Sequence, residues 1–222
     1  MNHGTRPAIH FVRHGESVAN VADRARRDRP DDSDRLSDRG WAQARELGRR
    51  LRDKGLEAIV ASPMRRAQET AAGIAETLDL PLSTDPDLFE VRQCDAFYAA
   101  RPDQQHRYAT LAWMPAADPT YAEPGAESFA DVVARVHRVQ QRLHGDADHG
   151  RVVAVSHFGF LHWFLGVTLF GEDFVPAHLP ALYRMGHANT GITVFERHDR
   201  RVMDGLDLSG WVLTTWNDQA HL

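Results

Sequence analysis

Cysteine is nearly absent from this sequence: Cys94 is the single cysteine among 222 residues. One thiol cannot form an intrachain disulfide, and it argues against a thiolate metal cage. Such sparse use of cysteine fits a reducing compartment, so we expect a cytoplasmic protein. The sequence also lacks the metal-ligand spacing His-Glu-x-x-His, and its 13 histidines are scattered. We therefore expect no metal site.

Long hydrophobic runs and an excess of positive charge are also missing. The longest apolar stretch, around residues 158–170, contains His162 and is too short to cross a bilayer. Residues 1–7 lack the apolar run of a signal peptide. The formal net charge of −5 gives no general attraction to nucleic acid or to an anionic membrane. We therefore expect a small-molecule ligand, and any anion site must be a local cluster of cations.

What is present is the composition of an ordinary globular protein, with 42% hydrophobic and 26% charged residues. Short apolar strands alternate with periodic helices along the chain. The predicted strands cover residues 8–12, 56–61, 80–84, 151–156, 191–195 and 211–215, and the predicted helices cover residues 37–55, 62–78, 125–145 and 158–171. This alternation predicts an α/β fold with a mainly parallel sheet.

Two helix starts carry clear signals. Ser37 precedes one helix as a candidate N-cap, and Gly55 is expected to end that helix. Ser62 can cap the next helix, where Pro63 suits the first helical position.

Two segments have no periodic pattern. Residues 21–35 are crowded with Asp and Arg and contain Pro30, which predicts a solvated loop at the rim of a site. Residues 91–124 are rich in Arg, Pro and aromatic residues, which predicts an ordered, lid-like insertion packed over that site. No repeat or linker divides the chain, so we expect one domain over residues 1–222.

Basic side chains follow several predicted strands. Arg13 and His14 follow the first strand, Arg66 lies in the first turns of the helix opened by Ser62, and His157 follows the strand at 152–155. Ligands of open α/β sheets bind at this edge. Each residue alone is compatible with an ordinary surface position. Together they predict a compact cationic pocket, because arginine forks bind phosphate oxygens.

One histidine of such a pocket can do chemistry. A neutral imidazole can attack phosphorus and carry the phosphoryl group covalently, while the other cations stabilise the charge on its oxygens. The leaving alkoxide needs a proton, and Glu90, beside the insertion, is a candidate general acid. That role requires a pocket that raises the pKa of Glu90. The alternative interpretation is a solvated loop carboxylate.

These motifs resemble those of the histidine phosphatase superfamily, also called the phosphoglycerate mutase-like family. They occur in the order of the family and span nearly the whole chain. They are Arg13-His14-Gly15-Glu16 with Asn20, Leu36–Ala44, Ser62-Pro63-Met64-Arg65-Arg66-Ala67, Thr70-Ala71, Glu90, Gly125–Ser128, Val155-Ser156-His157 and Asn217–Leu222.

The resemblance implies a role for each matching residue. His14 is implied as the nucleophile that becomes phosphohistidine, and Glu90 as the proton donor. The implied phosphate pocket consists of Arg13, Arg66 and His157, with Arg65 outside it. Ser17 and Asn20 match loop positions that contact the substrate or the phosphoryl group. The implied fold is a three-layer α/β/α sandwich, and the chemistry of the family needs no metal or other cofactor.

Departures from the family pattern favour a phosphatase branch. Glycolytic mutases usually carry Trp-Asn where this chain has Ala19-Asn20, and Arg where Val91 follows the acid. Phe158 and Glu69 stand where Gly and Gln are common, which concerns details of the pocket and not the chemistry. The terminal motif Asn217–Leu222 is more similar to that of bacterial phosphatase branches than to that of the mutases. We therefore expect a phosphomonoesterase of small phosphorylated metabolites. A phosphoryl-transferring mutase, which would need a bisphosphoglycerate primer, and an inactive phospholigand-binding or scaffold protein are the alternatives.

A serine hydrolase built on the adjacent Ser156 and His157 is disfavoured. Neighbouring side chains on an extended strand point to opposite faces, and no Gly-x-Ser-x-Gly elbow is present. We expect the insertion to set specificity for a sugar, a second phosphate or an aromatic group. The candidate residues there are Arg92, Tyr98, Arg101, His106, Arg107, Tyr108 and Trp113. The substrate stays open, and so does the oligomeric state, a homodimer included.

Overall fold

The structure is a computed structural model of the chain. It describes residues 6–24, 32–100, 104, 118–145, 150–198, 201–203, 206–207 and 209–222.

The described strands form a six-stranded sheet in the order β3-β2-β4-β1-β5-β8, and a separate two-stranded hairpin, β6-β7. Their bounds are Ala8–Arg13 (β1), Ala58–Ala61 (β2), Leu82–Thr84 (β3), Arg151–Ser156 (β4), Ile192–His198 (β5), Arg201–Met203 (β6), Leu206–Asp207 (β7) and Gly210–Asp218 (β8). The pairs β3-β2, β2-β4 and β4-β1 are parallel, whereas β5 is antiparallel to both neighbours. The prediction of a mainly parallel sheet is confirmed.

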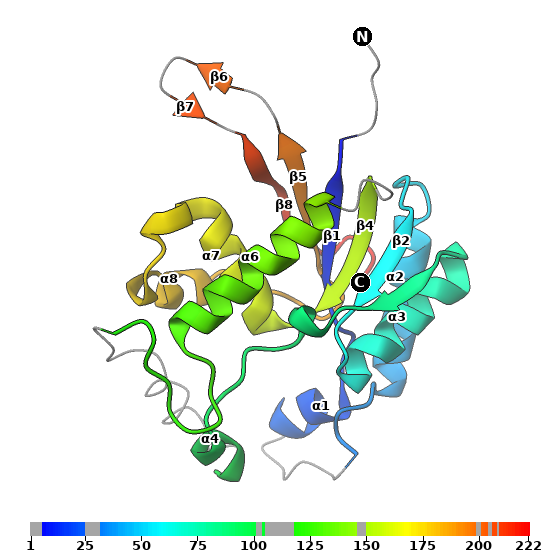
Figure 1. Ribbon diagram of the computed structural model, residues 1–222. Helices are drawn as coiled ribbons and strands as arrows, with labels where there is room; N and C mark the ends of the chain where they lie inside the picture. The colour runs from blue at the N-terminus through cyan, green and yellow to red at the C-terminus, as the bar shows by residue number, and fades with distance from the viewer. Residues whose placement is uncertain are drawn as a thin grey trace.

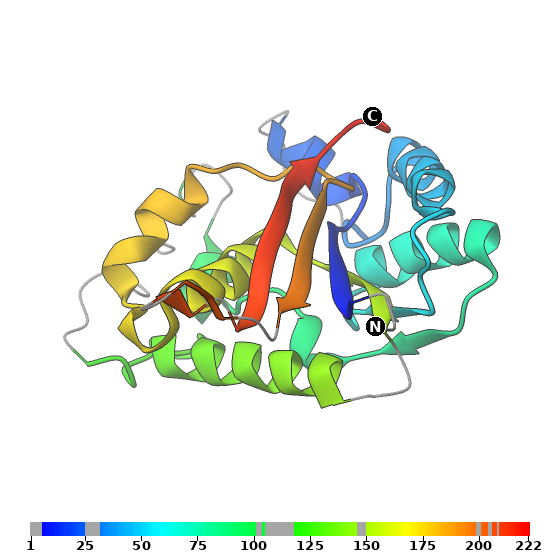
Figure 2. The same cartoon turned by 90° about the horizontal axis from the view of Figure 1, so that it is seen from above.

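Helices cover both faces of this sheet (Figures 1 and 2). Their bounds are Val18–Arg24 (α1), Asp38–Leu51 (α2), Arg65–Leu78 (α3), Asp95–Ala99 (α4), Phe129–Gly145 (α6), Phe158–Phe170 (α7) and Leu179–Tyr183 (α8), with short 3-10 turns at Pro86–Leu88 (η1), Gly171–Asp173 (η2) and Pro176–His178 (η3). Apolar side chains of α2 and α3 pack on one face of the sheet. Those of α6, α7 and α8 pack on the other face. The predicted three-layer α/β/α sandwich is confirmed.

The core strands β1 and β4 explain the near-continuous apolar runs of the sequence. All residues of β1 but Arg13, and all residues of β4 but Arg151, are buried. Alternate side chains feed the two hydrophobic clusters: Phe11 packs with Phe164 on the α7 side, and Val12 joins the cluster of α2 and α3. Such strands need apolar residues at successive positions because both faces are covered.

Strand register brings the predicted site residues level with one another. Arg13 of β1 lies opposite Ser156 of β4, so that His14 and His157 leave the sheet side by side. Ala61 of β2 lies opposite Val155. Because these strands are parallel, their carboxyl ends meet at one edge of the sheet, and α1 and α4 lie beyond that edge (Figure 1).

Some local predictions are wrong. Residues 21–24 belong to helix α1 rather than to a loop, and α2 ends at Leu51, before Gly55. Ser62 does not cap α3, whose N-cap is Met64. The prediction for Ser37 is confirmed, because its hydroxyl accepts a hydrogen bond from Gly40 N at 3.1 Å.

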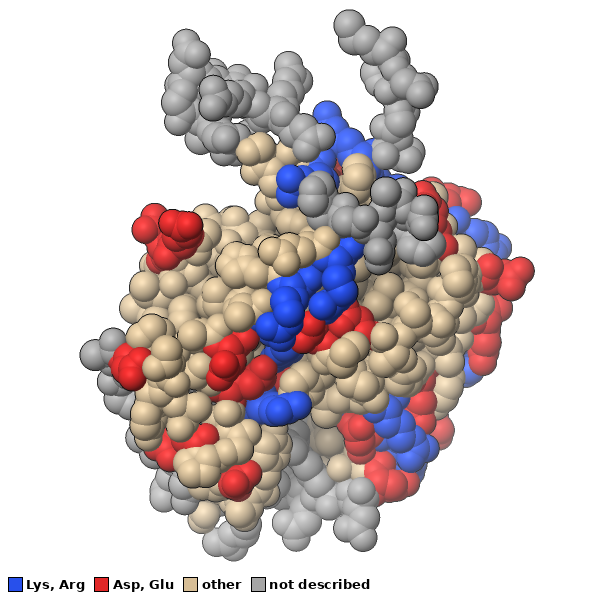
Figure 3. Space-filling model, viewed as in Figure 1, with Lys and Arg blue, Asp and Glu red and all other residues tan. Residues whose placement is uncertain are grey.

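Charged side chains on α6 tie this helix to η1. Blue and red side chains lie next to each other across this face of the molecule (Figure 3). Arg138 pairs with Asp87 at 2.8 Å, and Arg142 pairs with Asp85 at 2.8 Å and with Asp87 at 2.6 Å. The charges of Arg138 and Arg142 are thus neutralised by Asp85 and Asp87. These ion pairs hold the segment that leads to Glu90 against α6.

Candidate active site

The hydrogen bonds of His14 orient its ring. Nδ1 lies 2.8 Å from the carbonyl oxygen of Gly15, which only accepts, so Nδ1 carries the proton. The lone pair is therefore on Nε2, where Arg66 Nε donates a hydrogen bond at 3.0 Å. Only 4% of the His14 surface is exposed. This arrangement presents one imidazole nitrogen as a nucleophile beside a guanidinium group.

Two glycines allow the loop after β1 to lie against α2. A Cβ on Gly15 would lie 2.7 Å from the carbonyl oxygen of Gly40. A Cβ on Gly40 would collide in turn with the backbone of Glu16. Thr70 of α3 completes the contact, because its hydroxyl accepts from Gly15 N at 2.9 Å and donates to Arg66 O at 2.7 Å. Gly15 and Gly40 are thus required because the loop after β1 and the start of α2 pack backbone against backbone.

Burial keeps both site histidines neutral. It lowers the pKa of His14 well below 6.5, and the nearby charges of Arg66 and then Arg13 lower it further. Burial is also the main cause that lowers the pKa of His157 well below 6.5, followed by the charge of Arg66. The ring centroids of the two histidines are 5.2 Å apart. At neutral pH His14 therefore keeps the lone pair that nucleophilic attack requires.

Arg13 and Arg66 bring positive charge near His14 from different elements. Arg13 Nη1 donates to His187 O at 2.6 Å, and its guanidinium lies 5.4 Å from the ring centroid of Phe158. Arg66 forms a close ion pair with Asp34, whose other oxygen accepts from Arg65 N at 3.0 Å. Asp34 thus occupies one N–H donor group of Arg66, the arginine that is predicted to bind phosphate.

His157 has one engaged and one open nitrogen. Its Nε2 lies 2.7 Å from Ser62 Oγ, and that oxygen accepts from Met64 N at 3.3 Å. The Ser62 hydroxyl can donate and can also accept a second hydrogen bond, so this contact is compatible with either neutral tautomer of His157. Nδ1 is buried and has no hydrogen-bond partner among the described residues. Ser62 positions this histidine rather than capping α3, which is why the predicted cap is wrong.

Glu90 is held at the start of α7, next to His157. Its Oε1 accepts from Val91 N at 2.9 Å and from Phe160 N at 3.0 Å, and Oε2 accepts from Gly159 N at 3.1 Å. Arg135 fixes the preceding residues by donating to the carbonyls of Asp87 at 2.8 Å and Phe89 at 2.7 Å. Glu90 is therefore a positioned pocket residue and not a solvated loop carboxylate.

Ser17 and Asn20 close the loop that carries His14. Ser17 N donates to Asn20 Oδ1 at 3.2 Å, and Asn20 N donates to Ser17 Oγ at 3.2 Å. Asn189 joins them, since its Nδ2 donates to His14 O at 3.0 Å and to Asn20 Oδ1 at 3.2 Å. The resemblance implies that Ser17 and Asn20 contact the substrate, and in this structure they hydrogen-bond to each other and Asn20 also to Asn189. Asn189 was missed because no motif marks the segment before β5.

Arg65 and Glu69 form a separate pair beside the site. Arg65 Nε donates to Glu69 Oε1 at 2.8 Å, and the Arg65 side chain is 56% exposed. Glu69 Oε2 accepts from Leu36 N at 2.6 Å. This geometry agrees with the assignment of Arg66, and not Arg65, to the pocket. Ser156 is also structural, because its hydroxyl donates to Leu88 O at 2.6 Å.

A pocket of about 540 Å³ opens beside these residues. Arg66 and Glu90 line it together with Asp34, and the remaining described walls come from Ser33, Met64, α1, α4, α7, α8 and residues 89–93. Part of the predicted insertion, Tyr98 of α4, thus reaches the site. Arg92 does not line this pocket, and its guanidinium lies 4.5 Å from the ring centroid of Phe89. The remaining insertion residues predicted to set specificity lie outside the described part of the chain, namely Arg101, His106, Arg107, Tyr108 and Trp113.

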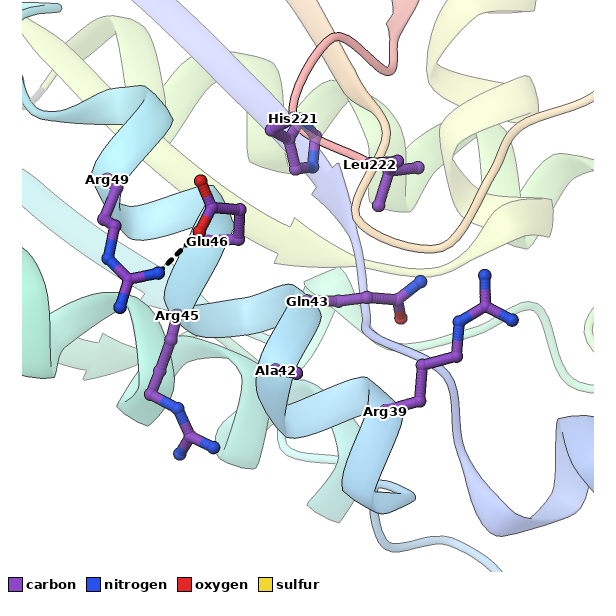
Figure 4. Close-up of a pocket in the computed structure, with 8 residues that line it drawn as sticks. All are labelled: Arg39, Ala42, Gln43, Arg45, Glu46, Arg49, His221 and Leu222. Atoms are coloured by element: carbon purple, nitrogen blue, oxygen red, sulfur yellow. Dashed lines mark hydrogen bonds and ion pairs between the residues drawn. The ribbon is translucent and has the colours of Figure 1, made fainter.

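A second pocket of about 440 Å³ lies along α2, near the C-terminus (Figure 4). Arg39, Arg45 and Arg49 line it with His221. Arg49 is paired with Glu46, which lies in the same pocket, at 2.5 Å. No residue of the predicted phosphate pocket lines this second pocket, so we do not assign phosphate binding to it.

Metal clusters and membrane-spanning helices were the two features that the sequence disfavoured. The described residues contain no group of three or more His, Cys, Asp or Glu side chains that could hold a metal ion. Among those residues, no helix has the length and apolar character to cross a membrane.

Comparison with known proteins gives consistent matches. The sequence model of the family described as "Histidine phosphatase superfamily (branch 1)" matches residues 9–218. A "Probable phosphoglycerate mutase" of Erwinia tasmaniensis is 28% identical over 223 residues, covering 96% of this chain and 94% of that protein. An uncharacterised protein of Mycobacterium tuberculosis is 34% identical over 149 residues, 67% of this chain and 72% of its own length.

A solved structure agrees with these sequence matches. Mycobacterial glucosyl-3-phosphoglycerate phosphatase, in a complex with VO3, superposes with a TM-score of 0.69 at 28% identity, covering 96% of this chain and 99% of that one. The family match covers almost the whole chain, and the residues that carry it lie together at one edge of the sheet. The chain therefore belongs to branch 1 of the histidine phosphatase superfamily.

Proposed function

We propose that this chain is a phosphomonoesterase that hydrolyses small phosphorylated metabolites through a phosphohistidine on His14. The observation that carries the proposal is the setting of His14: Nδ1 is tied to a carbonyl at 2.8 Å, and Nε2 faces Arg66 at 3.0 Å. A neutral imidazole with this orientation is suited to attack phosphorus. Its place in a family whose relatives here bear phosphatase and mutase names supports the same chemistry.

In the first step, the lone pair of His14 Nε2 forms a bond to phosphorus while the bond from phosphorus to the leaving oxygen breaks. Glu90 supplies the proton that this oxygen takes up, so the product leaves as a neutral alcohol. In the second step, water attacks the phosphohistidine and gives its proton to Glu90. The N–P bond then breaks, which returns His14 to its neutral state and releases phosphate.

Cationic and neutral donors surround the transferred group. Arg13, Arg66 and His157 in its Nδ1–H tautomer would stabilise the charge on the equatorial oxygens, which is the main task in phosphoryl transfer. The buried Nδ1 of His157, without a partner in the described structure, supports this role. A phosphoryl group would also have to displace Asp34 from Arg66.

The first test is phosphate release from a panel of sugar, nucleotide and glycerate phosphates, measured without added metal. We expect release by the wild type and none by the His14→Ala variant, which should also trap no phosphoenzyme. Substantial activity in His14→Ala would overturn the nucleophile assignment. An activity lost on treatment with a metal chelator would contradict the metal-independent chemistry.

A mutase is the second candidate, and the name of the Erwinia tasmaniensis relative favours it. A mutase holds the product while the phosphoryl group returns to another oxygen, whereas a phosphatase admits water. Little phosphate release, together with activity that appears only after a bisphosphoglycerate primer is added, would select the mutase. No turnover with or without the primer would select an inactive phospholigand-binding protein.

A further inference from the structure

Aromatic rings form much of the wall of the pocket beside Arg66 and Glu90. The five that line it are Phe89, Phe97, Tyr98, Phe158 and Tyr183. They come from segments far apart in the sequence, and the proposed chemistry uses none of them. The small side chain of Ala19 lines the same space. With a volume of about 540 Å³, the pocket has room for a leaving group considerably larger than glycerate.

Several of these rings are braced by their neighbours. The guanidinium of Arg92 lies 4.5 Å from the ring centroid of Phe89, and that of Arg135 lies 4.8 Å from it. Phe158 has Arg13 at 5.4 Å from its centroid and Tyr183 at 5.8 Å. A ring that is already held loses little conformational freedom when a ligand packs on it. This wall is therefore preorganised for a flat apolar group.

The charges that line the pocket disfavour an anionic leaving group. Among its described lining residues, Arg66 is the cation, whereas Asp34 and Glu90 are acidic. Arg66 serves the transferred phosphoryl group in the proposed mechanism. Glu90 holds a proton when the substrate binds in that mechanism, so Asp34 is the negative charge that a carboxylate or second phosphate on the leaving group would meet, and the described lining offers such a group no cation besides Arg66.

We propose that the substrate is the phosphate monoester of a neutral alcohol that carries an aromatic or similarly flat apolar group. This inference rests on the proposed phosphatase function and names the substrate class of the same site. The phosphoryl group would lie at His14, the ester oxygen at Glu90, and the apolar body against Phe89, Phe158 and Tyr98. Phosphorylated hydroxy acids such as phosphoglycerate fit this surface poorly.

Three synthetic esters test the proposal: phenylpropyl phosphate, butyl phosphate and the phosphate ester of omega-hydroxypentanoate. Each loses a primary alkoxide, so differences in kcat/KM report on binding of the leaving group and not on its basicity. We expect the phenyl ester to exceed the carboxylate ester by about 100-fold, from ring packing together with the absence of charge repulsion. Butyl phosphate should lie between them.

Two variants locate the effect. Tyr98 is 59% exposed, so Tyr98→Ala should fold normally. It should lower kcat/KM for the phenyl ester by about fivefold, the order of one aromatic contact, and affect butyl phosphate less. Tyr121→Ala is the matched control, because Tyr121 is 47% exposed and does not line this pocket. It should leave both esters unchanged.

The outcomes separate this inference from the proposed function. Hydrolysis of the carboxylate ester as fast as the phenyl ester, or an equal loss on both neutral esters in Tyr98→Ala, would overturn the substrate class and leave the phosphatase assignment standing. Phosphate release from none of the three esters, nor from nitrophenyl phosphate, would overturn the phosphatase assignment and the inference with it.

Discussion

The ion pair between Asp34 and Arg66 leads to a prediction about product inhibition. Asp34 contacts the guanidinium that the proposed mechanism assigns to the phosphoryl group. Phosphate therefore has to break this pair and then tolerate a carboxylate nearby. Asp34→Asn removes the charge but keeps an oxygen that can accept from Arg65 N. We expect inorganic phosphate to inhibit the variant more strongly than it inhibits the wild type.

The magnitude follows from the exposure of the pair. At ~4 Å, two unit charges interact by about 1 kcal/mol in water and about 4 kcal/mol at an effective dielectric constant of ~20. The Arg66 side chain is 15% exposed, but that of Asp34 is 42% exposed. Solvent screening therefore places the effect at the lower end, about 1 kcal/mol. This corresponds to a decrease of about fivefold in the inhibition constant of phosphate.

The assay is competitive inhibition of nitrophenyl phosphate hydrolysis by inorganic phosphate at low and high salt. Asp32→Asn is the matched control, because Asp32 lies in the same loop but pairs with Arg35, at 2.7 Å on the surface. The control should keep the inhibition constant of the wild type. An unchanged or larger constant in Asp34→Asn would refute the reasoning, since it would mean that Asp34 does not compete with phosphate. The difference should shrink as salt is added.

Three further predictions concern the proton donor and the buried histidines. Glu90→Gln should slow alkyl phosphates far more than nitrophenyl phosphate, whose leaving group needs no proton; an equal loss on both would exclude Glu90 as the acid. Gly159→Ala places a Cβ 2.5 Å from Glu90 Oε1, so we expect the same selective loss, while His14 should still be phosphorylated by nitrophenyl phosphate. Burial lowers the pKa of His187 from 6.5 to about 4, so the folded state binds fewer protons than the unfolded state between these values. The contribution of neutral His187 to the free energy of unfolding should therefore be complete above pH 6.5. It should fall by up to about 3 kcal/mol as the pH drops to 4 and below. Urea unfolding across this range should show a shallower pH dependence for His187→Gln, and an unchanged slope would contradict the assignment.

The elements with strong periodic or continuous apolar patterns were predictable. The strand at 151–156 has the predicted bounds, and the helix predicted to end at Gly145 ends there. A strand that is buried on both faces shows a continuous apolar run, and a helix that is buried along one stripe shows an apolar periodicity, so both can be recognised in the sequence. Short elements were not predictable in the same way. Helix α1 spans only Val18–Arg24. The hydrogen bond from Ser17 N to Asn20 Oδ1 at its start joins residue types that are equally common in loops, so they do not predict a helix. Such segments depend on tertiary contacts more than on their own pattern.

The site divides in the same manner. His14, Arg13, Arg66 and His157 were predictable because each follows or opens an element of a parallel sheet, and parallel strands end at one edge. Asp34 and Asn189 were not predictable, since no spacing in the sequence relates them to His14. Asn189 reaches His14 O from the segment that precedes β5. Ser62 also shows this limit, because its hydroxyl serves His157 and not the helix that follows it.

Local sequence pattern thus sufficed to predict the layered α/β fold, the family and the residues that match its motifs, because periodicity and short motifs are local properties of a chain. Tertiary contacts alone set which nitrogen of His14 faces Arg66, which carboxylate pairs with that arginine, and which rings line the pocket beside them. These properties arise from distances between side chains remote in sequence, and burial then sets their protonation. The family can therefore be recognised from local pattern, whereas the lining of the pocket depends on how distant segments meet.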